Sequence, residues 1–287
     1  MSGRFILFCI LFCLFGITLT IYYDIASRPI VITQANVLTS IEDAESNIAT
    51  STTIIKSLDT VDTRPMYLEI TRSCFPSYDD TCAHAYAAPT ESSSRRQALR
   101  TGMVLLVDET VENELGETWH RIAFAEELRY RERLSLPWYV SDTVVTTFRD
   151  DGIINLDADS ATTSKRIVVD LTQQMLYAYD AEELFLATTT ATGLWATPTP
   201  RGHFRVYRKT PTRYMQGPIP GITSQYYDLP GVPWNLYFTN EGAIVHDVYW
   251  HNTFGSRYSN GCVNLPTATA RLLYEWADIG TLVIVRD

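Results

Sequence analysis

The sequence lacks an excess of basic residues, and this absence excludes a large class of functions. Its 23 Lys and Arg residues face 33 Asp and Glu residues, which leaves a formal net charge of −10. A general nucleic-acid-binding protein needs a basic surface to displace counterions from phosphate, so no nucleic acid is expected as a partner. Glycine and proline, with 14 and 13 residues, are too few for a collagen-like chain. The 287 residues are typical of a globular protein and suffice for two ordinary domains.

Charge is also missing from a long apolar run near the N-terminus, Phe5 to Tyr23, which lies between Arg4 and Asp24. Because a helix needs roughly 20 apolar residues to span a bilayer, residues 1–23 are predicted to form a transmembrane anchor. A cleaved signal peptide is the alternative, but its apolar core usually has only about 7 to 15 residues. Arg4 predicts that the N-terminus stays inside and that the rest of the chain lies outside. The expected location is therefore the cell envelope, outside the cytoplasm, with residues 5–23 in the membrane.

The chain has only five cysteines, which limits its metal and disulfide chemistry. Cys9 and Cys13 lie within the apolar run and are expected to pack there. In an oxidising compartment the neighbouring Cys74 and Cys82 are expected to form a disulfide, which leaves Cys262 unpaired. The five histidines and these cysteines show no paired ligand spacing, so no metal site is expected. A lone thiol outside the cell therefore calls for an explanation.

Composition divides the rest of the chain into distinct stretches. Residues 24–62 are rich in Ser, Thr and Asp without sustained periodicity, which is typical of a flexible linker. Residues 63–150 contain short alternating runs separated by turns, which predict a small all-β domain. Residues 165–287 contain further strand patterns and a helical pattern over 267–276. Within them, 210–234 has several prolines and glycines and no clear period, which predicts a long loop.

Cys262 has the neighbours that a nucleophilic thiol requires. A free thiol has a pKa near 8.5, so a catalytic cysteine needs a partner that stabilises its thiolate. His246 ends a predicted strand sixteen positions earlier, and a loop between the two residues would let the imidazole act as this partner. Gly261 allows a close approach of the backbone to a substrate, and the amides of Gly261 and Cys262 are candidates to face an oxyanion. The alternative interpretation is structural, with a small core cysteine and a histidine satisfied at a strand end.

Several ordered motifs surround this pair. They are Ile167 to Tyr179, Thr192-Gly193, Thr197-Pro198-Thr199-Pro200-Arg201-Gly202-His203-Phe204, His246, Ser259-Asn260-Gly261-Cys262-Val263-Asn264, Ala270 to Trp276 and Gly280 to Val283. In this order they resemble the L,D-transpeptidase (YkuD-type) domain over about residues 165–286. The signature of that family is a His followed by a Ser/Thr-x-Gly-Cys-hydrophobic-Arg/Asn segment. The position before Gly261 is very commonly His in the family and is Asn260 here.

A second resemblance concerns residues 63–150. Ala87-Ala88-Pro89, Leu99-Arg100-Thr101-Gly102 and Trp119-His120-Arg121-Ile122 resemble the motif order of bacterial SH3-like modules, which often bind wall peptides. A purely structural spacer is the alternative role. Together the two resemblances imply a mainly β fold, with a small SH3-like β-barrel followed by a YkuD-type β-sandwich that has one or more short helices.

The YkuD-type resemblance implies a peptidoglycan L,D-transpeptidase that acts on stem peptides and needs no cofactor. The Cys262 thiolate would attack a donor tetrapeptide between its third residue and D-Ala, and His246 would protonate the departing amine. The side-chain amine of an acceptor stem would then resolve the thioester into a 3-3 cross-link. A backbone carbonyl next to His246, such as that of Asp247, would orient the imidazole. Family members characteristically react with carbapenems, so Cys262 is expected to do so.

Other residues near the pair are candidates for supporting roles. His251, eleven residues before Cys262, is a rival base and otherwise shapes the loop or contacts substrate. Ser259 is expected to bond within the turn. The candidates for substrate binding are His251, Trp250, Asn260, Asn264 and Tyr249. Two alternative functions stay open, namely an L,D-carboxypeptidase in which water resolves the same thioester and a non-catalytic wall-binding protein. The oligomeric state is not predicted.

Overall fold

The computed structural model describes residues 62–287, apart from 80, 125–127 and 156–162. The predicted anchor at 1–23 and nearly all of the predicted linker at 24–62 lie outside the described residues. Within the described part of the chain, no helix is both long and apolar enough to cross a membrane.

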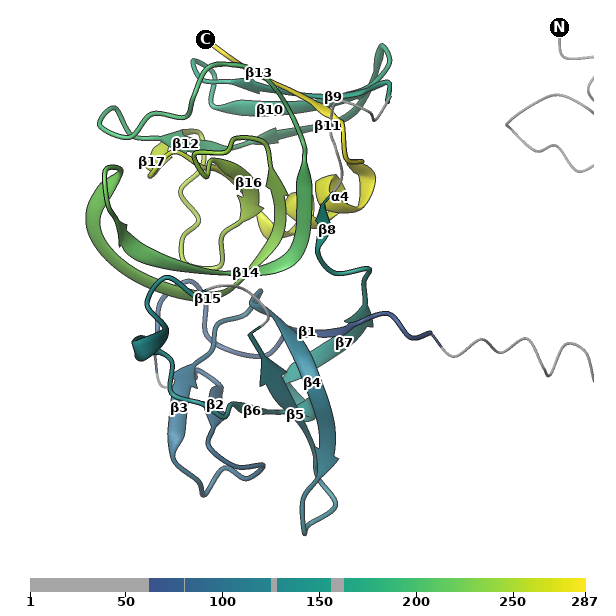
Figure 1. Cartoon of the computed structure of the whole chain (residues 1–287), viewed down its shortest axis with the longest axis vertical. Helices are drawn as coiled ribbons and strands as arrows, with labels where there is room; N and C mark the ends of the chain where they lie inside the picture. The colour runs from purple at the N-terminus through teal and green to yellow at the C-terminus, as the bar shows by residue number, and fades with distance from the viewer. Residues whose placement is uncertain (1–61, 80, 125–127, 156–162) are drawn as a thin grey trace, which may run out of the picture. The chain divides into compact units, whose positions relative to one another are not determined.

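The first module, residues 63–150, is built on a seven-stranded sheet with the strand order β3-β2-β6-β5-β4-β1-β7 (Figure 1). Its elements are β1 (Met66–Ile70), β2 (His84–Tyr86), β3 (Arg95–Ala98), β4 (Val104–Glu112), β5 (Thr118–Ala123), η1 (Arg131–Arg133), β6 (Tyr139–Ser141), η2 (Asp142–Val144) and β7 (Val145–Arg149). Asn113 shapes the β4–β5 turn, because its side-chain oxygen accepts hydrogen bonds from the backbone N–H groups of Leu115 and Glu117. The expected disulfide between Cys74 and Cys82 is present. The SH3-like assignment of this module stays a prediction.

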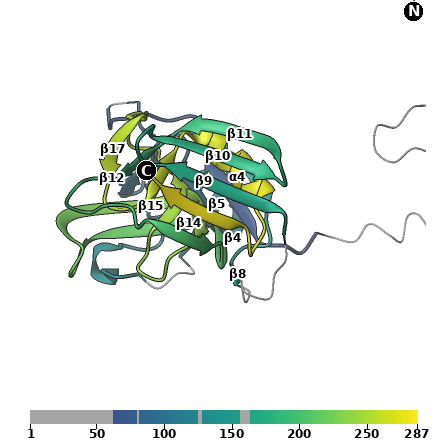
Figure 2. The same cartoon turned by 90° about the horizontal axis from the view of Figure 1, so that it is seen from above.

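The second module, which begins with β8 and continues to residue 287, has two sheets. The five-stranded sheet has the order β11-β10-β9-β19-β13 and the seven-stranded sheet has the order β17-β12-β18-β16-β15-β14-β8. The elements are β8 (Ile154–Asn155), β9 (Lys165–Asp170), β10 (Met175–Asp180), β11 (Glu183–Thr189), β12 (Ala191–Gly193), β13 (Gly202–Arg205), β14 (Arg208–Ile219), β15 (Thr223–Tyr237), β16 (Ile244–Asp247), β17 (Ser256–Ser259), β18 (Val263–Leu265), α4 (Thr267–Trp276) and β19 (Leu282–Arg286). Figure 2 shows β9, β10 and β11 side by side above α4. The predicted mainly β fold is confirmed.

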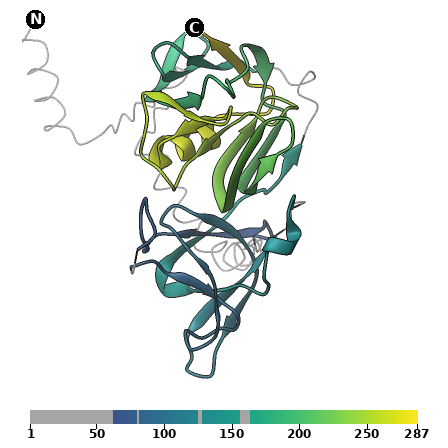
Figure 3. The same cartoon turned by 90° about the vertical axis from the view of Figure 1, so that its left-hand side faces the viewer.

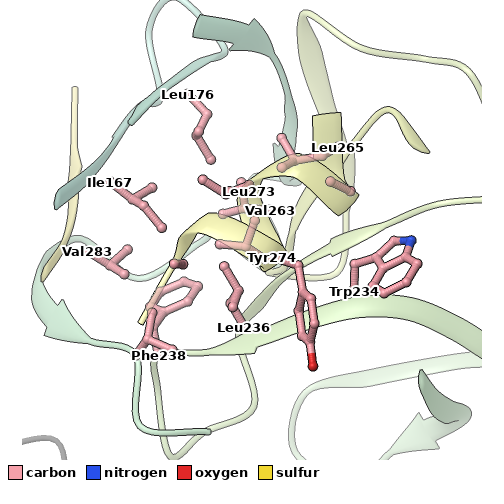
Figure 4. Close-up of a cluster of buried hydrophobic side chains, with 14 of the residues drawn as sticks. Ile167, Leu176, Trp234, Leu236, Phe238, Val263, Leu265, Leu273, Tyr274 and Val283 are labelled. Carbon is pink, nitrogen blue, oxygen red and sulfur yellow. The ribbon is translucent and has the colours of Figure 1, made fainter. Parts of the chain in front are cut away.

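Alternating side chains from both sheets meet helix α4 in a buried core (Figure 4). Ile167 and Val283 come from the five-stranded sheet, Leu236 and Val263 from the seven-stranded sheet, and Leu273 from the helix. All five side chains are at most 1% exposed, and each contributes roughly 1.5 to 3 kcal/mol of burial free energy. This core fixes the positions of β16, which carries His246, and of β18, which begins directly after Cys262.

The prediction of a long loop over 210–234 is wrong. Strands β14 and β15 pair over most of this range as an antiparallel hairpin, seen in green in Figures 1 and 3. The register shifts between Arg213 and Met215 and again between Gly217 and Ile219. Such irregularities insert residues that break the alternation of buried and exposed side chains, so the period of a strand is lost from the sequence. The hairpin therefore brings an ordered surface to the second module where a loop was expected.

The two modules share buried surface within the compact unit formed by residues 63–287. Val232 and Tyr249 of the second module pack into a core cluster whose other buried members belong to the first module. Arg271 of α4 forms an ion pair with Glu69 of β1 at 3.3 Å. The second module therefore packs directly on the first, and its long hairpin lies within this contact.

Candidate active site

Strand register brings the predicted base beside the predicted nucleophile. Strand β16 runs parallel to β18, and Val245 pairs with Val263 while His246 pairs with Asn264. Val245 and Val263 are buried in the core between the sheets. Since successive side chains of a strand point to opposite faces, His246 and Asn264 lie on the face away from this core. Cys262 directly precedes Val263, and its sulfur accepts from the backbone N–H of Ile244, two residues before His246 on β16.

The Cys262 side chain is a free thiol directly before β18 and is partly exposed. The backbone N–H of Ile244 donates a hydrogen bond to its sulfur, and the Gly242 carbonyl oxygen lies 3.9 Å from Sγ. Burial raises the pKa of the thiol, whereas the Ile244 hydrogen bond and the positive charge of Arg213 lower it. Because burial is the largest of these effects, the thiol is protonated at rest at neutral pH.

His246 is 2% exposed, and the neighbouring backbone selects its tautomer. Its Nδ1 lies 2.6 Å from the carbonyl oxygen of Asp247. A carbonyl oxygen can only accept, so Nδ1–H donates and Nε2 keeps its lone pair. Burial lowers the pKa of His246 to about 4, against the opposing effect of the Asp247 hydrogen bond, so the ring is neutral at pH 7. This tautomer can accept a proton through Nε2, as a general base must.

Ser259 and Gly261 form the turn that leads into Cys262. The Ser259 hydroxyl donates to the carbonyl oxygen of Cys262 at 2.5 Å and accepts from the Gly261 N–H at 3.2 Å. Gly261 has a φ of 112°, a conformation that residues with a Cβ rarely adopt. The expected turn role of both residues fits this geometry. The Gly261 N–H is already bonded within the turn, which does not suit the expected oxyanion role of that amide.

His251, the rival base, has a protein partner at each ring nitrogen. Nδ1 accepts from the Thr253 N–H at 3.1 Å, and Nε2 lies 3.0 Å from the side-chain amide of Asn264. The contacting atom is Asn264 Nδ2, which, like the Thr253 N–H, can only donate, and the two nitrogens of a neutral imidazole cannot both accept. We therefore assign the Asn264 amide with its oxygen toward Nε2–H, which also gives Oδ1, otherwise unpartnered among the described residues, a donor. Burial lowers the pKa of His251 to about 4, which keeps the ring neutral. His251 and Asn264 thus hold each other, and this pairing favours the loop-shaping role of His251 over the role of base.

Tyr249 and Trp250 differ in what they can contact. Tyr249 is 0% exposed and donates to the Pro230 carbonyl at 2.6 Å, so the expectation that it binds substrate is wrong for this structure. The side chain of Tyr249 is buried in the core cluster that the second module shares with the first. Trp250 is partly exposed, and its ring stacks on the His246 imidazole with centroids 5.9 Å apart. Trp250 therefore both shields the base and remains a candidate for substrate contact.

The β14–β15 hairpin supplies site residues that the sequence does not predict. The Asn260 side-chain N–H donates to the Gln225 side-chain oxygen at 3.0 Å, which ties the hairpin to the turn before Cys262. Burial, followed by the charge of Cys262, raises the pKa of Tyr227 to about 12. Arg213 is close enough for its charge to lower the pKa of both Cys262 and His246. No motif marks these residues, because they gain their positions from hairpin pairing.

Comparison with known protein families gives a match over the second module. Residues 164–285 match the L,D-transpeptidase catalytic domain, YkuD. The YkuD match begins just before β9 and ends within β19, so it includes both His246 and Cys262. It supports the resemblance predicted over about 165–286. The first module lies outside the YkuD match.

Solved L,D-transpeptidase structures are similar to the chain. The enzyme from Mycobacterium smegmatis has 21% identity and a TM-score of 0.40, with 71% of this chain and 99% of that chain covered. The E. faecium catalytic domain, in a structure acylated by ertapenem, has 26% identity and a TM-score of 0.39, with 44% and 100% covered. The Stackebrandtia nassauensis protein has 27% identity and a TM-score of 0.36, with 44% and 57% covered. A search of curated proteins found no match.

Proposed function

We propose that the protein is a peptidoglycan L,D-transpeptidase that forms 3-3 cross-links through a thioester on Cys262. The observation that supports this proposal is the register of β16 and β18, which pairs His246 with Asn264, two residues after Cys262. The sulfur is partly exposed, and the imidazole has its acceptor nitrogen at Nε2. The YkuD match over 164–285 supports the choice of peptidoglycan stem peptides as substrate.

The first half of the reaction forms the thioester. As the Cys262 sulfur bonds to the carbonyl carbon of the third stem residue, the thiol proton passes to His246 Nε2. The tetrahedral intermediate then collapses, the bond to the D-Ala nitrogen breaks, and that nitrogen takes the proton from His246. D-Ala leaves as a free amino acid. The Asp247 carbonyl, which accepts from His246 Nδ1–H, holds the ring in the same tautomer throughout.

The second half transfers the acyl group to an acceptor. The side-chain amine of an acceptor stem attacks the thioester carbonyl and gives a proton to His246 Nε2. The carbon–sulfur bond breaks as the peptide bond forms, and the sulfur takes the proton back. Since burial keeps His246 neutral and the Cys262 thiol protonated, the pair rests as thiol and imidazole. Proton transfer then accompanies each attack, so no resting thiolate–imidazolium pair is needed.

Location and domain organisation are part of the proposal. The chain acts outside the cytoplasm, anchored through residues 1–23 and extended by a linker at 24–62. The SH3-like module at 63–150 precedes a catalytic domain at 165–287. The disulfide between Cys74 and Cys82 supports an oxidising compartment.

The decisive experiment follows acylation of Cys262 by intact mass. Purified protein is incubated with a tetrapeptide stem, with and without an acceptor stem, and separately with a carbapenem. The wild type is expected to gain a tripeptide acyl group and a carbapenem adduct, and to yield the 3-3 linked product when the acceptor is present. Cys262→Ala is expected to lose both adducts and to keep its fold, because the side chain is only partly buried. Circular dichroism and the melting temperature check the fold.

Each other outcome identifies a different function. A Cys262→Ala variant that still gains the adduct would show that the nucleophile is another residue. Release of free tripeptide in the presence of the acceptor, without a cross-linked product, would identify an L,D-carboxypeptidase. A wild type that binds wall fragments and never gains an adduct would identify a non-catalytic wall-binding protein.

A further inference from the structure

The tip of the β14–β15 hairpin is held by a short segment of the first module, Tyr130 to Arg133. The Gln216 side chain bonds twice to the Tyr130 backbone: its oxygen accepts from the Tyr130 N–H at 2.8 Å, and its nitrogen donates to the Tyr130 carbonyl at 3.1 Å. Gln216 is only 4% exposed, so water does not compete well for these groups. Because the Gln216 side-chain amide bonds to both the backbone N–H and the backbone carbonyl of Tyr130, it fixes the position of the hairpin against the first module.

Two side chains of the same segment hold the hairpin backbone. The Tyr130 hydroxyl donates to the Pro218 carbonyl at 2.9 Å, and Arg133 Nη1 donates to the Gly217 carbonyl at 2.7 Å. The guanidinium carbon of Arg133 lies 3.8 Å from the ring centroid of Tyr130 and 4.5 Å from that of Tyr226. Arg133 thus stacks on Tyr130 of the first module and on Tyr226 of the second, while it donates to the backbone of Gly217.

The same hairpin is also bonded to the turn before Cys262, through Gln225 and Asn260. Gly217 pairs with Tyr227 across the hairpin, and a Cβ added to Gly217 would lie 2.2 Å from the Tyr227 ring. The Tyr227 ring therefore packs flush against the backbone that Arg133 holds. Gln225 of the same strand is bonded to Asn260, two residues before Cys262, and the charge of Cys262 is among the causes that raise the pKa of Tyr227. Contacts therefore run from Arg133 through Gly217 and Gln225 to Asn260, in the turn before Cys262.

We propose that Tyr130 and Arg133 of the first module are positioning residues for the reaction at Cys262. They hold the β14–β15 hairpin where Tyr227 and Gln225 form a wall beside the sulfur, against which the donor peptide docks. The first module is then part of the catalytic apparatus, in addition to any role as wall binder or spacer. This inference rests on the proposed function, because it needs a peptide substrate at Cys262.

Two reagents of different size separate positioning of the wall from reactivity of the thiol. Iodoacetamide is small and reports the reactivity of Cys262 itself, whereas a tetrapeptide stem must dock against the wall before it acylates the same sulfur. The variants are Arg133→Ala and the milder Tyr130→Phe, which keeps the ring and removes the hydroxyl that bonds to Pro218. Arg131→Ala is the matched control, since Arg131 lies on the same short helix and is exposed.

Full-length variants are compared for both rates and for melting temperature. Arg133→Ala is expected to slow peptide acylation by about ten- to a hundredfold, the loss that follows a displacement of about 1 Å near a reacting group. Its alkylation by iodoacetamide should stay within about twofold of wild type, and Arg133→Lys, which can still donate to Gly217, should recover part of the peptide rate. Tyr130→Phe should show a smaller loss of the same kind. Arg131→Ala should match wild type with both reagents.

The results distinguish failure of this inference from failure of the proposed function. Wild-type peptide acylation in both Arg133→Ala and Tyr130→Phe would overturn the positioning role while leaving the transpeptidase proposal intact. An equal loss of both rates, in step with a lower melting temperature, would reduce the contacts to ordinary domain packing. A wild type that iodoacetamide alkylates and no stem peptide acylates would overturn the proposed function, and the positioning role with it.

Discussion

His246 and His251 are both buried imidazoles near Cys262, yet their hydrogen bonds assign them different roles. His246 donates from Nδ1 to the Asp247 carbonyl and keeps a lone pair on Nε2, whereas His251 is bonded at both nitrogens. A base needs a nitrogen that can accept the proton of the nucleophile, which in this pair only His246 offers.

Replacing each histidine in turn tests this assignment. His246→Ala should lower the rate of Cys262 acylation by about 10² to 10⁴, the usual contribution of a general base. His251→Ala should cost less than about tenfold and act mainly through stability, because it leaves Asn264 without its partner. Rates of adduct formation by mass spectrometry, with melting temperatures as the control, decide the ranking. The reverse order would make His251 the base.

The sequence singles out Cys262 and His246 as the reactive pair, which stays a prediction, and it does not reveal the residues around them. Cys262 and His246 stand in ordered motifs, and the turn chemistry of Ser259 and Gly261 follows from local sequence. Tyr249 was expected to face substrate and is buried, because its orientation depends on how the second module packs on the first. Arg213 acts on the pKa of Cys262 because of where hairpin pairing puts it. The sequence around Arg213 is rich in proline and does not predict that pairing.

Among the elements, the β14–β15 hairpin depends most on a single close contact. At Gly217 a Cβ would meet the Tyr227 ring at 2.2 Å and the Gln225 carbonyl oxygen at 2.6 Å. The second of these is backbone and cannot rotate away. Gly217→Ala must therefore move the strand that carries both Tyr227 and Gln225.

The expected result is a loss of about 1 to 3 kcal/mol in the free energy of unfolding, typical of overpacking, together with slower peptide acylation. Gly221→Ala is the control in the turn of the same hairpin, where an added Cβ meets nothing within 4 Å. Its positive φ of 79° should cost about 1 kcal/mol without moving Tyr227. Urea unfolding and acylation rates check both variants. Equal acylation by the two variants would mean that the position of Tyr227 has no bearing on the reaction.

Elements with a regular period could be predicted, and those without one could not. The helical spacing over 267–276 predicts the range at which α4 is found. The alternating runs of 63–150 likewise become a sheet. The hairpin was missed because its bulges and its buried prolines, such as Pro211, remove the alternation on which a strand prediction relies.

At the scale of the whole molecule, Asp247 links stability to pH. Its side chain is 0% exposed; Oδ1 accepts from the Thr267 hydroxyl at 3.0 Å, and Oδ2 has no partner among the described residues. Burial raises the pKa of this carboxyl from 3.8 to about 7. A raised folded-state pKa gives stability that is complete below pH 3.8 and is lost as the pH rises through about 7.

Asp247→Asn should therefore gain stability relative to wild type as the pH rises, by up to about 1.4 kcal/mol per pH unit. The gain is expected between pH 3.8 and about 7. His246 and His251, whose pKa values fall from 6.5 to about 4, act in the opposite sense, since their stabilisation is complete above pH 6.5 and is lost as the pH falls through about 4. Both proteins contain them, so their effect cancels in the difference. Urea unfolding at several pH values measures the difference in free energy of unfolding between Asp247→Asn and wild type. A difference that does not change with pH would contradict the claim that burial raises the pKa of Asp247.

Strands β16 and β18 pair directly in parallel, so the segment that connects them is not needed to hold them together. The backbone leaves β16 after Asp247, forms β17 at the edge of the same sheet and enters β18 at Val263, and the ladder between β16 and β18 fixes His246 opposite Asn264. The excursion is anchored near its ends by His251 and Ser259. The point between Phe254 and Gly255 lies after the Thr253 N–H that is bonded to His251 and before β17, and it is thus a graft site where a foreign loop could be installed to change which wall material is recruited.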